Sequence, residues 1–409
     1  MRVKRCKGTR DLSPEEMRRF RFIEEVFRGC CLKWGYEEVK TPTLEYLHLF
    51  TSTGTLTPGM LGKVYSFLDW DGWSGERVVL RPDGTIPVAR LYIDSMADKE
   101  LAKLFYVTNI FRFEATGKET RERWQGGAEL IGASFPLADI ELVVLALEVL
   151  KRVGLEGVEL KLSHVGLIRG LLLESGLSPE EQAKIFAQIL DGDVEVLAKI
   201  KPKRPELGEV LSLLDSKGKS AGFLRNFKVL FAQSLPELEP PLDNFITIVD
   251  LLEALGYDYQ IDLASGRGFE YYTGVIFQLF IGEEKIGGGG RYDALIPLMS
   301  GRDVPASGFA LYLDPLMNLA KPATLTEPLA QSVLIKVEPE AIKQGFNIAS
   351  YLHEAGYVAE FKLGGQEPAN LRWILEVRSE APSFILTDQV KHQRFEAQTA
   401  NEVLALLSR

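Results

Sequence analysis

The sequence predicts an α+β protein made of two folded parts, and three observations support this prediction. First, β-rich runs occur at 77–85, 103–114 and 128–133, and an amphipathic helical pattern follows the last of them. Second, the pattern changes to short helices from about 167 to 235, which indicates a helical insertion. Third, strand and helix patterns alternate after a proline- and threonine-rich stretch at 321–331, as in a small α/β domain.

Length and composition set the domain organisation. A chain of 409 residues with 46% hydrophobic and 25% charged residues can bury large cores and should divide into two or three domains. We expect a first domain over 1–320, which carries the insertion, and a second domain over 332–409. Residues 321–331 are the expected linker between them.

Composition also limits the class of protein. No apolar run of 18 residues could span a bilayer and the basic N-terminus lacks the apolar segment of a secretory signal, so we expect a soluble cytoplasmic protein that binds no membrane. Adjacent Cys30 and Cys31 are expected to be buried free thiols. Four scattered histidines argue against a zinc site, and we expect neither metal nor cofactor. The net charge of −10 is a weak argument against nucleic-acid binding, because a local basic patch can occur on an acidic protein.

The first helix should begin at Ser13-Pro14-Glu15-Glu16, which combines a cap residue, a proline at the first helical position and a glutamate at the third. Apolar residues then recur at helical spacing up to Gly35, which ends the helix. A strand is predicted at 36–42, a helix at 139–154 and a strand at 158–166.

Within the insertion, Ser178-Pro179 should open another helix, and the basic segment 199–209 is expected to be a solvated loop. Strands are predicted again at 257–264 and 271–282. In the second domain the predicted order is strand 333–337, helix, strand 358–363, helix, strand 384–388, strand 394–398, helix.

Four stretches carry candidate chemistry, and the first is LRPDGT at 80–85. Asp83 and Thr85 are two residues apart and would share one face if the strand continues, where they could bind an ammonium group. Pro-Asp-Gly is also an ordinary turn sequence, so this stretch alone leaves both interpretations open.

The second stretch is FRFE at 111–114, followed by a charged loop and a returning β-rich run. Such a hairpin would direct Arg112, Gln125 and Glu129 from adjacent strands into one pocket. Polar side chains on apolar strands are costly unless they are paired or used. Glu129 could instead pair with Arg112 or Arg267 inside the sheet.

The third stretch is GRGFEYYTG at 266–274, and the fourth is GGGGRYD at 287–293. Four glycines let a backbone approach a ligand closely, but a glycine-rich hairpin turn is the simpler account. The run matches neither a Walker loop nor a dinucleotide-binding fingerprint. The apolar stretch GFALYLDPLMNL at 308–319 is either a plain core helix or the last wall of a ligand site.

Taken together and in this order, these stretches resemble the histidyl-tRNA synthetase family, a class II aminoacyl-tRNA synthetase family, over nearly the whole chain. The resemblance rests on KGTRDLSP, WGYEEVKTPTLE, LRPDGT, FRFE with the later Gln125 and Glu129, RGFEYYTG and GGGGRYD. It implies a mainly antiparallel sheet flanked by helices, a helical insertion, and a C-terminal α/β domain similar to the family's anticodon-binding domain.

The resemblance also implies a histidine pocket. Asp83, which replaces a glutamate of the family, and Thr85 would face the amino group. Glu129 and Tyr272 would face the imidazole, while Gln125 and Arg267 would face the carboxylate. The complete set of expected histidine-binding residues is Asp83, Thr85, Arg112, Gln125, Glu129, Arg267, Tyr271, Tyr272 and Tyr292.

The sequence departs from the synthetases where they bind ATP. Their third motif reads approximately Gly-Phe-Ala-x-Gly-x-Glu-Arg-Leu, and its arginine holds the γ-phosphate. Here Pro315 stands at the arginine position and Tyr312 at the preceding glycine, so a phosphate loses charge-assisted hydrogen bonds worth about 1.5 to 3 kcal/mol each. In the second motif, Arg123 replaces the phenylalanine that stacks on adenine. These changes predict that the chain does not activate ATP, so we expect no catalytic residue.

A synthetase-like body with a histidine pocket and an altered nucleotide site is similar to the family of ATP phosphoribosyltransferase regulatory subunits, as are RPDGTIPVARL, SHVGLIRGLL and GGAELIG. That similarity implies assembly with a short catalytic subunit, which the chain activates and through which it relays feedback by histidine. It also implies a homodimer within a hetero-octamer, without nucleic acid. Members often lack the C-terminal domain, which here holds more acidic than basic residues and does not suit an anticodon stem.

Two alternatives remain at this point. The chain could be a divergent histidyl-tRNA synthetase, or a free-standing paralogue that serves another partner. A short, separate phosphoribosyltransferase in the same organism would distinguish these alternatives, because a long self-regulating form makes a regulatory subunit redundant.

Overall fold

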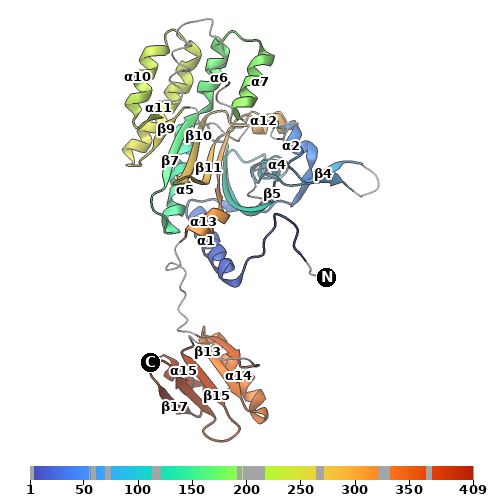
Figure 1. Cartoon of the computed structure of the whole chain (residues 1–409), viewed down its shortest axis with the longest axis vertical. Coiled ribbons are helices and arrows are strands. Elements are labelled where there is room, and N and C mark those ends of the chain that lie inside the picture. The colour runs from blue at the N-terminus through green and yellow to red at the C-terminus, as the bar shows by residue number, and fades with distance from the viewer. Residues whose placement is uncertain are drawn as a thin grey trace. The chain divides into compact units, whose positions relative to one another are not determined.

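The computed structural model shows two compact units, Met1–Thr324 and Leu325–Arg409, which are described separately (Figure 1). The structure describes residues 4–54, 56, 61–69, 75–112, 121–190, 196, 217–263, 271–320, 332–364 and 371–408. The predicted linker, the basic segment 199–209 and Arg267 lie outside the described residues.

A nine-stranded sheet forms the centre of the first unit, in the order β1-β5-β6-β12-β11-β10-β7-β9-β8. Its six central strands pair antiparallel, whereas β1 with β5 and β7 with β9 pair parallel. The strands are β1 (Glu37–Glu38), β5 (Ala102–Phe111), β6 (Glu122–Ile131), β7 (Glu159–His164), β8 (Lys217–Gly218), β9 (Gln260–Asp262), β10 (Val275–Ile281), β11 (Glu284–Arg291) and β12 (Ala306–Tyr312). The predicted α+β class and the hairpin of β5 with β6 are confirmed.

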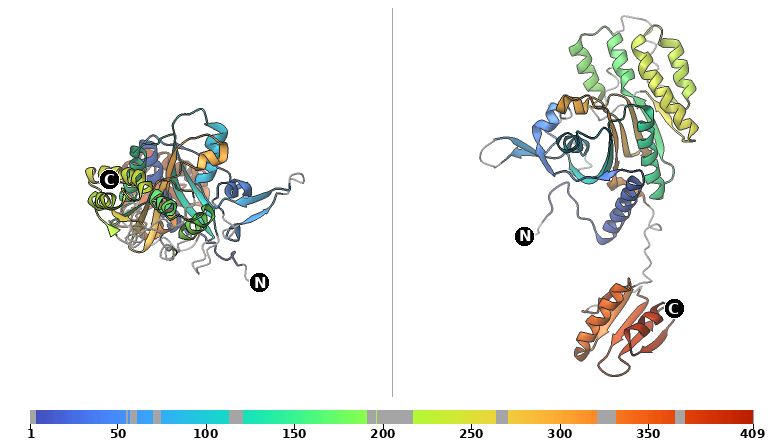
Figure 2. Two further views of the ribbon diagram at one scale, coloured as in Figure 1. Left: turned by 90° about the horizontal axis from the view of Figure 1, so that it is seen from above. Right: turned by 180° about the vertical axis from the view of Figure 1, so that it is seen from behind.

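The helices of this unit lie on both faces of the sheet and beyond one end of it. They are α1 (Pro14–Lys33), α2 (Leu47–Ser52), α4 (Thr85–Ser95), α5 (Pro136–Arg152), α6 (Val165–Glu174), α7 (Pro179–Leu190), α10 (Ala221–Phe231), α11 (Glu239–Ala254), α12 (Leu295–Ser300) and α13 (Leu313–Leu319). Helix α1 begins with the predicted capping box between Ser13 and Glu16. Figures 1 and 2 show α6, α7, α10 and α11 gathered at one end of the sheet, where helix continues to Ala254, beyond the predicted 167–235.

One face of the sheet is an aromatic core under α1, α5 and α13. Phe27, Phe105, Phe277 and Phe309 meet there, with the ring centroids of Phe27 6.1 Å from Phe105 and 6.3 Å from Phe309. The free thiols Cys30 and Cys31 are buried in the same core, as predicted. This packing anchors the strands whose opposite face carries the polar residues described below.

A small sheet, β2-β4-β3, stands beside the large one and corrects the prediction for 77–85. Its strands are β2 (Leu44–Tyr46), β3 (Ser66–Leu68) and β4 (Arg77–Leu80). Strand β4 ends at Leu80 and helix α4 begins at Thr85, so Asp83 and Thr85 do not share the face of a strand. The cause is local: Pro82 has no N–H to donate, and the Asp83 carboxylate accepts the backbone N–H of Ile86 at 2.9 Å.

The run of four glycines is not a hairpin turn, so the simpler sequence-based account was wrong. Gly287 to Gly290 lie inside β11, paired on one side with β10 and on the other with β12. The backbones are too close for side chains here: a Cβ on Gly289 would lie 2.2 Å from the carbonyl oxygen of Gly308. Glycine therefore serves close strand packing in the middle of the sheet.

The apolar stretch 308–319 is not one core helix, because its first half belongs to β12 and its second half is α13. Strand β12 pairs with both β6 and β11, which places Gly308 directly between Glu129 and Gly290. Sequence periodicity could not separate the halves, since both are buried and short apolar runs look alike in strands and helices.

The second unit is a five-stranded mixed sheet, β14-β13-β15-β16-β17, with two helices packed on its core face. Its elements are β13 (Ser332–Val337), α14 (Ile342–Glu354), β14 (Val358–Phe361), β15 (Trp373–Val377), β16 (Phe384–Asp388), β17 (Gln393–Ala397) and α15 (Ala400–Leu407). The helix predicted between β14 and β16 is wrong for the described residues, which form β15 between β13 and β16. Its large apolar side chains, such as Trp373 and Leu375, complete the sheet core.

Substituting Gly289 should destabilise the first unit. In Gly289→Ala the new Cβ meets the backbone of β12, which cannot move without disturbing two strand pairings. We expect the free energy of unfolding in urea to fall by about 3 kcal/mol. The matched control is Gly29→Ala on helix α1, where a Cβ meets nothing within 4 Å and should raise stability by up to about 1 kcal/mol. Equal effects of the two substitutions would contradict this account of the glycine run.

Candidate functional site

The second face of the large sheet carries polar side chains over a floor of glycines. Residues opposite one another in antiparallel strands point to the same face, so Glu129 on β6 shares this face with Gly308 on β12 and Gly290 on β11. A Cβ on Gly308 would lie 1.8 Å from Oε2 of Glu129. The carboxyl of Glu129 therefore occupies the space that a side chain at 308 would need.

Glu129 is 1% exposed and is surrounded by hydroxyl groups. Thr85 donates to its Oε1 at 2.7 Å, Tyr106 donates to the same oxygen at 3.2 Å, and the Tyr292 hydroxyl donates to Oε2. Burial raises the pKa of Glu129 to about 8, although the hydroxyls of Tyr292 and Thr85 oppose the shift. In the part of the chain that the structure describes, Glu129 forms no ion pair. A ligand with an N–H group or a positive charge could therefore donate a hydrogen bond to this carboxyl or form an ion pair with it.

Asp83 and Thr85 reach the site from the start of α4. Asp83 is buried, and burial raises its pKa against the opposing charge of Arg112. Arg112, at the end of β5, donates its Nε–H to the carbonyl oxygen of Pro82 at 2.6 Å. This bond ties the loop before α4 to the sheet, so a carboxylate and a guanidinium stand at the same end of the site.

Three tyrosines, Tyr271, Tyr272 and Tyr292, form one wall of the site and pack in the same cluster as residues of α4. Tyr271 lies 5.3 Å from Tyr272 and 5.5 Å from Tyr292 between ring centroids, both edge to face. All three are buried. A Cβ on Gly290 would come within 3.2 Å of the Tyr272 ring, so the absence of a side chain at this position lets the ring pack against the backbone of β11. The wall combines apolar rings with hydroxyl groups, which suits a small aromatic ligand with polar atoms.

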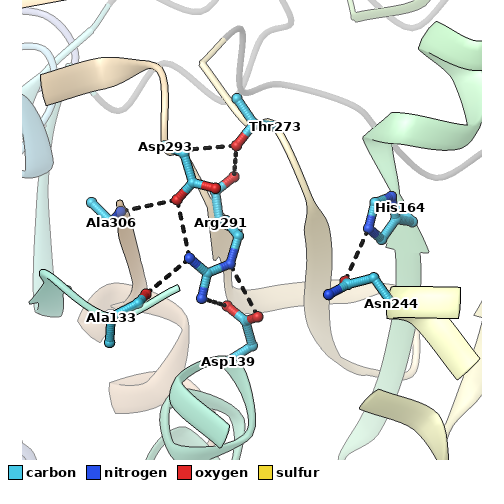
Figure 3. Close-up of polar contacts among 8 residues, drawn as sticks. All are labelled: Ala133, Asp139, His164, Asn244, Thr273, Arg291, Asp293 and Ala306. Atoms are coloured by element: carbon cyan, nitrogen blue, oxygen red, sulfur yellow. Dashed lines mark hydrogen bonds and ion pairs between the residues drawn. The ribbon is translucent and has the colours of Figure 1, made fainter. Parts of the chain in front are cut away.

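A network of ion pairs and hydrogen bonds surrounds Arg291, the residue before Tyr292 (Figure 3). Arg291 pairs with Asp139 at 2.9 Å and with Asp293 at 3.0 Å, and it also donates to the carbonyl oxygen of Ala133. The backbone N–H of Asp293 donates to the Thr273 hydroxyl at 2.9 Å. Because Tyr272 precedes Thr273 and Tyr292 follows Arg291, the network fixes both tyrosine-bearing segments. Burial raises the pKa of Asp139 to about 6 despite the Arg291 charge.

A second polar pair in the same view joins the sheet to the helical region (Figure 3). His164 accepts the N–H of Gly166 at Nδ1, so its Nε2–H donates to Oδ1 of Asn244 on α11 at 3.2 Å. Burial lowers the pKa of His164 to about 4, which keeps the ring neutral. The next residue, Val165, donates its N–H to the carbonyl oxygen of Gly274, beside the tyrosine wall.

The structure brings most of the predicted site together. Asp83, Thr85, Arg112, Gln125, Glu129, Tyr271, Tyr272 and Tyr292 all belong to this region, whereas Arg267 lies outside the described residues. Glu129 does not pair with Arg112, so that half of the alternative for the carboxyl is wrong, whereas a pair with Arg267 falls outside the described residues.

Two residues of the site were missed from the sequence. Tyr106 lies six residues before Arg112, and residues an even number of positions apart in a strand share a face. Strand alternation from Arg112 could therefore have placed Tyr106 on the face of the site. Gly308 had no such signal, because its role depends on the register between β6 and β12.

Two features are absent from the described ranges. No group of three or more His, Cys, Asp or Glu side chains there is arranged to hold a metal ion. No helix among those residues is long and apolar enough to cross a membrane.

Comparison with known proteins places the chain in a family. Residues 8–316 match the histidyl-tRNA synthetase family. The chain is 52% identical over 407 residues to the ATP phosphoribosyltransferase regulatory subunit of Dehalococcoides mccartyi strain BAV1, with 99% of this chain and 98% of the relative covered. The chain belongs to the family of ATP phosphoribosyltransferase regulatory subunits.

This family is close to the synthetases in sequence and in fold. The chain is 34% identical over 426 residues to the histidine–tRNA ligase of Methanosarcina acetivorans, covering 99% of this chain and 98% of that one. A solved ATP phosphoribosyltransferase regulatory subunit/histidyl-tRNA synthetase from Bacillus halodurans superposes with a TM-score of 0.78 at 24% identity, over 93% of this chain and 100% of that one. Histidyl-tRNA synthetase from Nostoc sp. PCC 7120 gives 0.76 at 20% identity, over 100% and 99%. The predicted class II synthetase-like fold is thereby confirmed.

The raised pKa of Glu129 predicts a pH-dependent stability in this family member. The folded protein holds a proton at Glu129 up to about pH 8, whereas the unfolded chain releases it above a pKa of 4.5. The stabilising contribution is complete below pH 4.5 and is lost as the pH rises through about 8. Between about pH 6 and about pH 9, we expect wild-type unfolding free energy to fall by about 2 to 3 kcal/mol more than that of Glu129→Gln.

Urea unfolding at a series of pH values measures this difference. Asp139 and His164 are present in both proteins, so their contributions to the pH dependence cancel when the unfolding free energy of the variant is subtracted from that of the wild type. Glu284→Gln, at the exposed start of β11, is the control and should follow the wild type. Parallel curves for wild type and Glu129→Gln would show that the carboxyl is ionised in the folded protein at neutral pH.

Proposed function

We propose that this chain is a regulatory, non-catalytic subunit of ATP phosphoribosyltransferase. In this role it binds histidine, activates a separate short catalytic subunit, and relays feedback inhibition in the first step of histidine biosynthesis. The observation that carries the proposal is the buried carboxyl of Glu129, which is held by hydroxyl groups and lacks an ion pair among the described residues. The family of the chain supports the regulatory part of the proposal.

The side chains around Glu129 match the groups of histidine. Glu129 accepts an imidazole N–H, and ionises as it does so, while the aromatic wall packs against the ring. Asp83 accepts hydrogen bonds from the ammonium group. The Thr85 hydroxyl donates its hydrogen to Glu129, so the lone pairs of its oxygen can accept a hydrogen bond from the same ammonium group. Gln125 and Arg112 provide N–H donors for the carboxylate. Arg267 belongs to the same proposal, at the carboxylate.

The third-motif region supports a binding role without ATP activation. Asp314 at the start of α13 accepts the backbone N–H of Trp124 at 2.8 Å and pairs with Arg10. Pro315 follows it and offers neither a charge nor an N–H. Tyr312 lies opposite Gln125, on the same face as the proposed pocket. A phosphate bound there as in the synthetases would meet a carboxylate and a tyrosine instead of an arginine.

The proposed partner is the short catalytic subunit, and the proposed assembly is a homodimer within a hetero-octamer. Histidine is the proposed effector, and no nucleic acid is involved. The acidic excess of the second unit agrees with the last point, because an anticodon stem requires neutralisation of its phosphates.

Assembly with a catalytic subunit is the direct test. Mixed with a short-form ATP phosphoribosyltransferase subunit, the chain should give one complex by light scattering and a raised rate of ATP condensation with phosphoribosyl pyrophosphate. The chain alone should show no histidine-dependent exchange of pyrophosphate into ATP. Separate elution with unchanged kinetics would refute the proposal, and exchange at a rate typical of synthetases would favour a divergent histidyl-tRNA synthetase.

Histidine binding should depend on Glu129. Glu129→Gln keeps the shape of the side chain but removes the carboxylate that forms on ligand binding, so calorimetry should show binding weaker by about 1 to 3 kcal/mol. Histidine inhibition of the assembled enzyme should weaken in parallel, while assembly remains intact. The matched control is Glu45→Gln, another buried glutamate, which lies on β2 of the small sheet and pairs with Arg90 on α4.

The control separates binding from stability. Glu45→Gln should lower the melting temperature through the loss of a salt bridge, and it should leave histidine inhibition unchanged. If Glu129→Gln behaves in the same way as Glu45→Gln, Glu129 has a structural role only and the pocket assignment fails.

A further inference from the structure

Tyr106 links two groups that the proposed function assigns to opposite ends of histidine. It lies on β5 with 3% of its surface exposed, opposite Gly127 on β6. Its hydroxyl donates to Glu129 at 3.2 Å and accepts the Nε2–H of Gln125 at 3.3 Å. The same hydroxyl therefore contacts the residue proposed for the imidazole and the residue proposed for the carboxylate.

Two glycines make room for the Tyr106 ring. A Cβ on Gly127 would lie 2.3 Å from ring atom Cζ, and a Cβ on Gly84 would lie 2.4 Å from Cε2. The ring is therefore confined between the middle of β6 and the start of α4. Because neither glycine has a positive φ, the close approach of the ring accounts for glycine at both positions.

Hydrogen-bond accounting shows what the hydroxyl does. A tyrosine hydroxyl has one hydrogen, and here it goes to Glu129, so the oxygen is available to accept from Gln125. That bond uses one hydrogen of the Gln125 amide and fixes the orientation of the amide. The second hydrogen is left for a ligand acceptor.

We propose that Tyr106 is a positioning residue that sets Glu129 and Gln125 together, so that the imidazole and the carboxylate of one histidine are recognised as a unit. This inference rests on the proposed function. It predicts that removing the hydroxyl weakens contacts at both ends of the ligand, although Tyr106 need not touch the ligand.

The experiment compares two ligands by calorimetry of the full chain. L-histidine has all three polar groups, whereas histamine has the imidazole and the amine but no carboxylate. In Tyr106→Phe, we expect histidine binding to weaken about 25-fold, as two positioning bonds are lost, and histamine binding to weaken about fivefold. Tyr92→Phe is the control, because it removes a buried hydroxyl on α4 that donates to the carbonyl oxygen of Lys99 at 3.0 Å.

A double variant tests the route through Gln125. Once Gln125→Leu has removed the carboxylate contact, adding Tyr106→Phe should weaken histidine and histamine equally, by about fivefold. Equal weakening of both ligands in the single Tyr106→Phe variant would overturn the link to the carboxylate end, and so would strict additivity in the double variant.

The remaining outcomes separate this inference from the proposed function. If wild type binds histidine and Tyr106→Phe binds both ligands as Tyr92→Phe does, the positioning role is overturned and the pocket assignment stands. If Tyr106→Phe is too unstable for measurement, Gln125→Leu alone is informative: it should weaken histidine far more than histamine, and equal effects would overturn the proposal. No histidine binding by wild type would overturn both.

Discussion

The first unit depends on burying one carboxyl group in the middle of an antiparallel sheet. Moving a carboxyl out of water is costly unless hydrogen bonds replace those of water. Here Thr85, Tyr106 and Tyr292 supply them from three different elements. The space comes from Gly308, directly across the strand pair from Glu129. Helix α4, strand β5 and the end of β11 must therefore all be correctly placed for this carboxyl to be satisfied.

The two faces of the sheet carry different kinds of side chain. One face carries large aromatic residues, such as Phe105 and Phe309, under α1 and α5. The other face has glycines on three neighbouring strands, and each is covered by a polar or aromatic side chain: Gly127 by Tyr106, Gly308 by Glu129 and Gly290 by Tyr272. Because these glycines have no side chains, the groups that cover them lie close to the backbone.

Contacts within the chain hold the segments that carry two tyrosines of the candidate site. The buried Arg291 network fixes the segments that carry Tyr272 and Tyr292, so the wall of the site does not depend on a ligand for its position. Nearby, Asp314 is engaged by Arg10 and by the backbone of β6.

The sequence by itself determined the features that depend on short-range chemistry. The family resemblance supplied the candidate site residues, whose role in binding stays a prediction. The capping box at Ser13 predicted the start of α1, and strand alternation around Arg112 and Glu129 predicted the hairpin of β5 and β6. These predictions held because caps, alternation and short loops act within a few residues along the chain.

Only the tertiary structure decided features that depend on strand neighbours. In the sequence, the glycines at 287–290 resemble a turn, and only the strands paired on both sides show that they lie inside the sheet. The role of Gly308 likewise follows only from the register that places it opposite Glu129. Tyr106 is one apolar-looking residue of a β-rich run until Gln125 and Glu129 reach its hydroxyl. The physical reason is that a register between distant segments is set by the packing of the whole sheet, and a side chain's partners follow from that register.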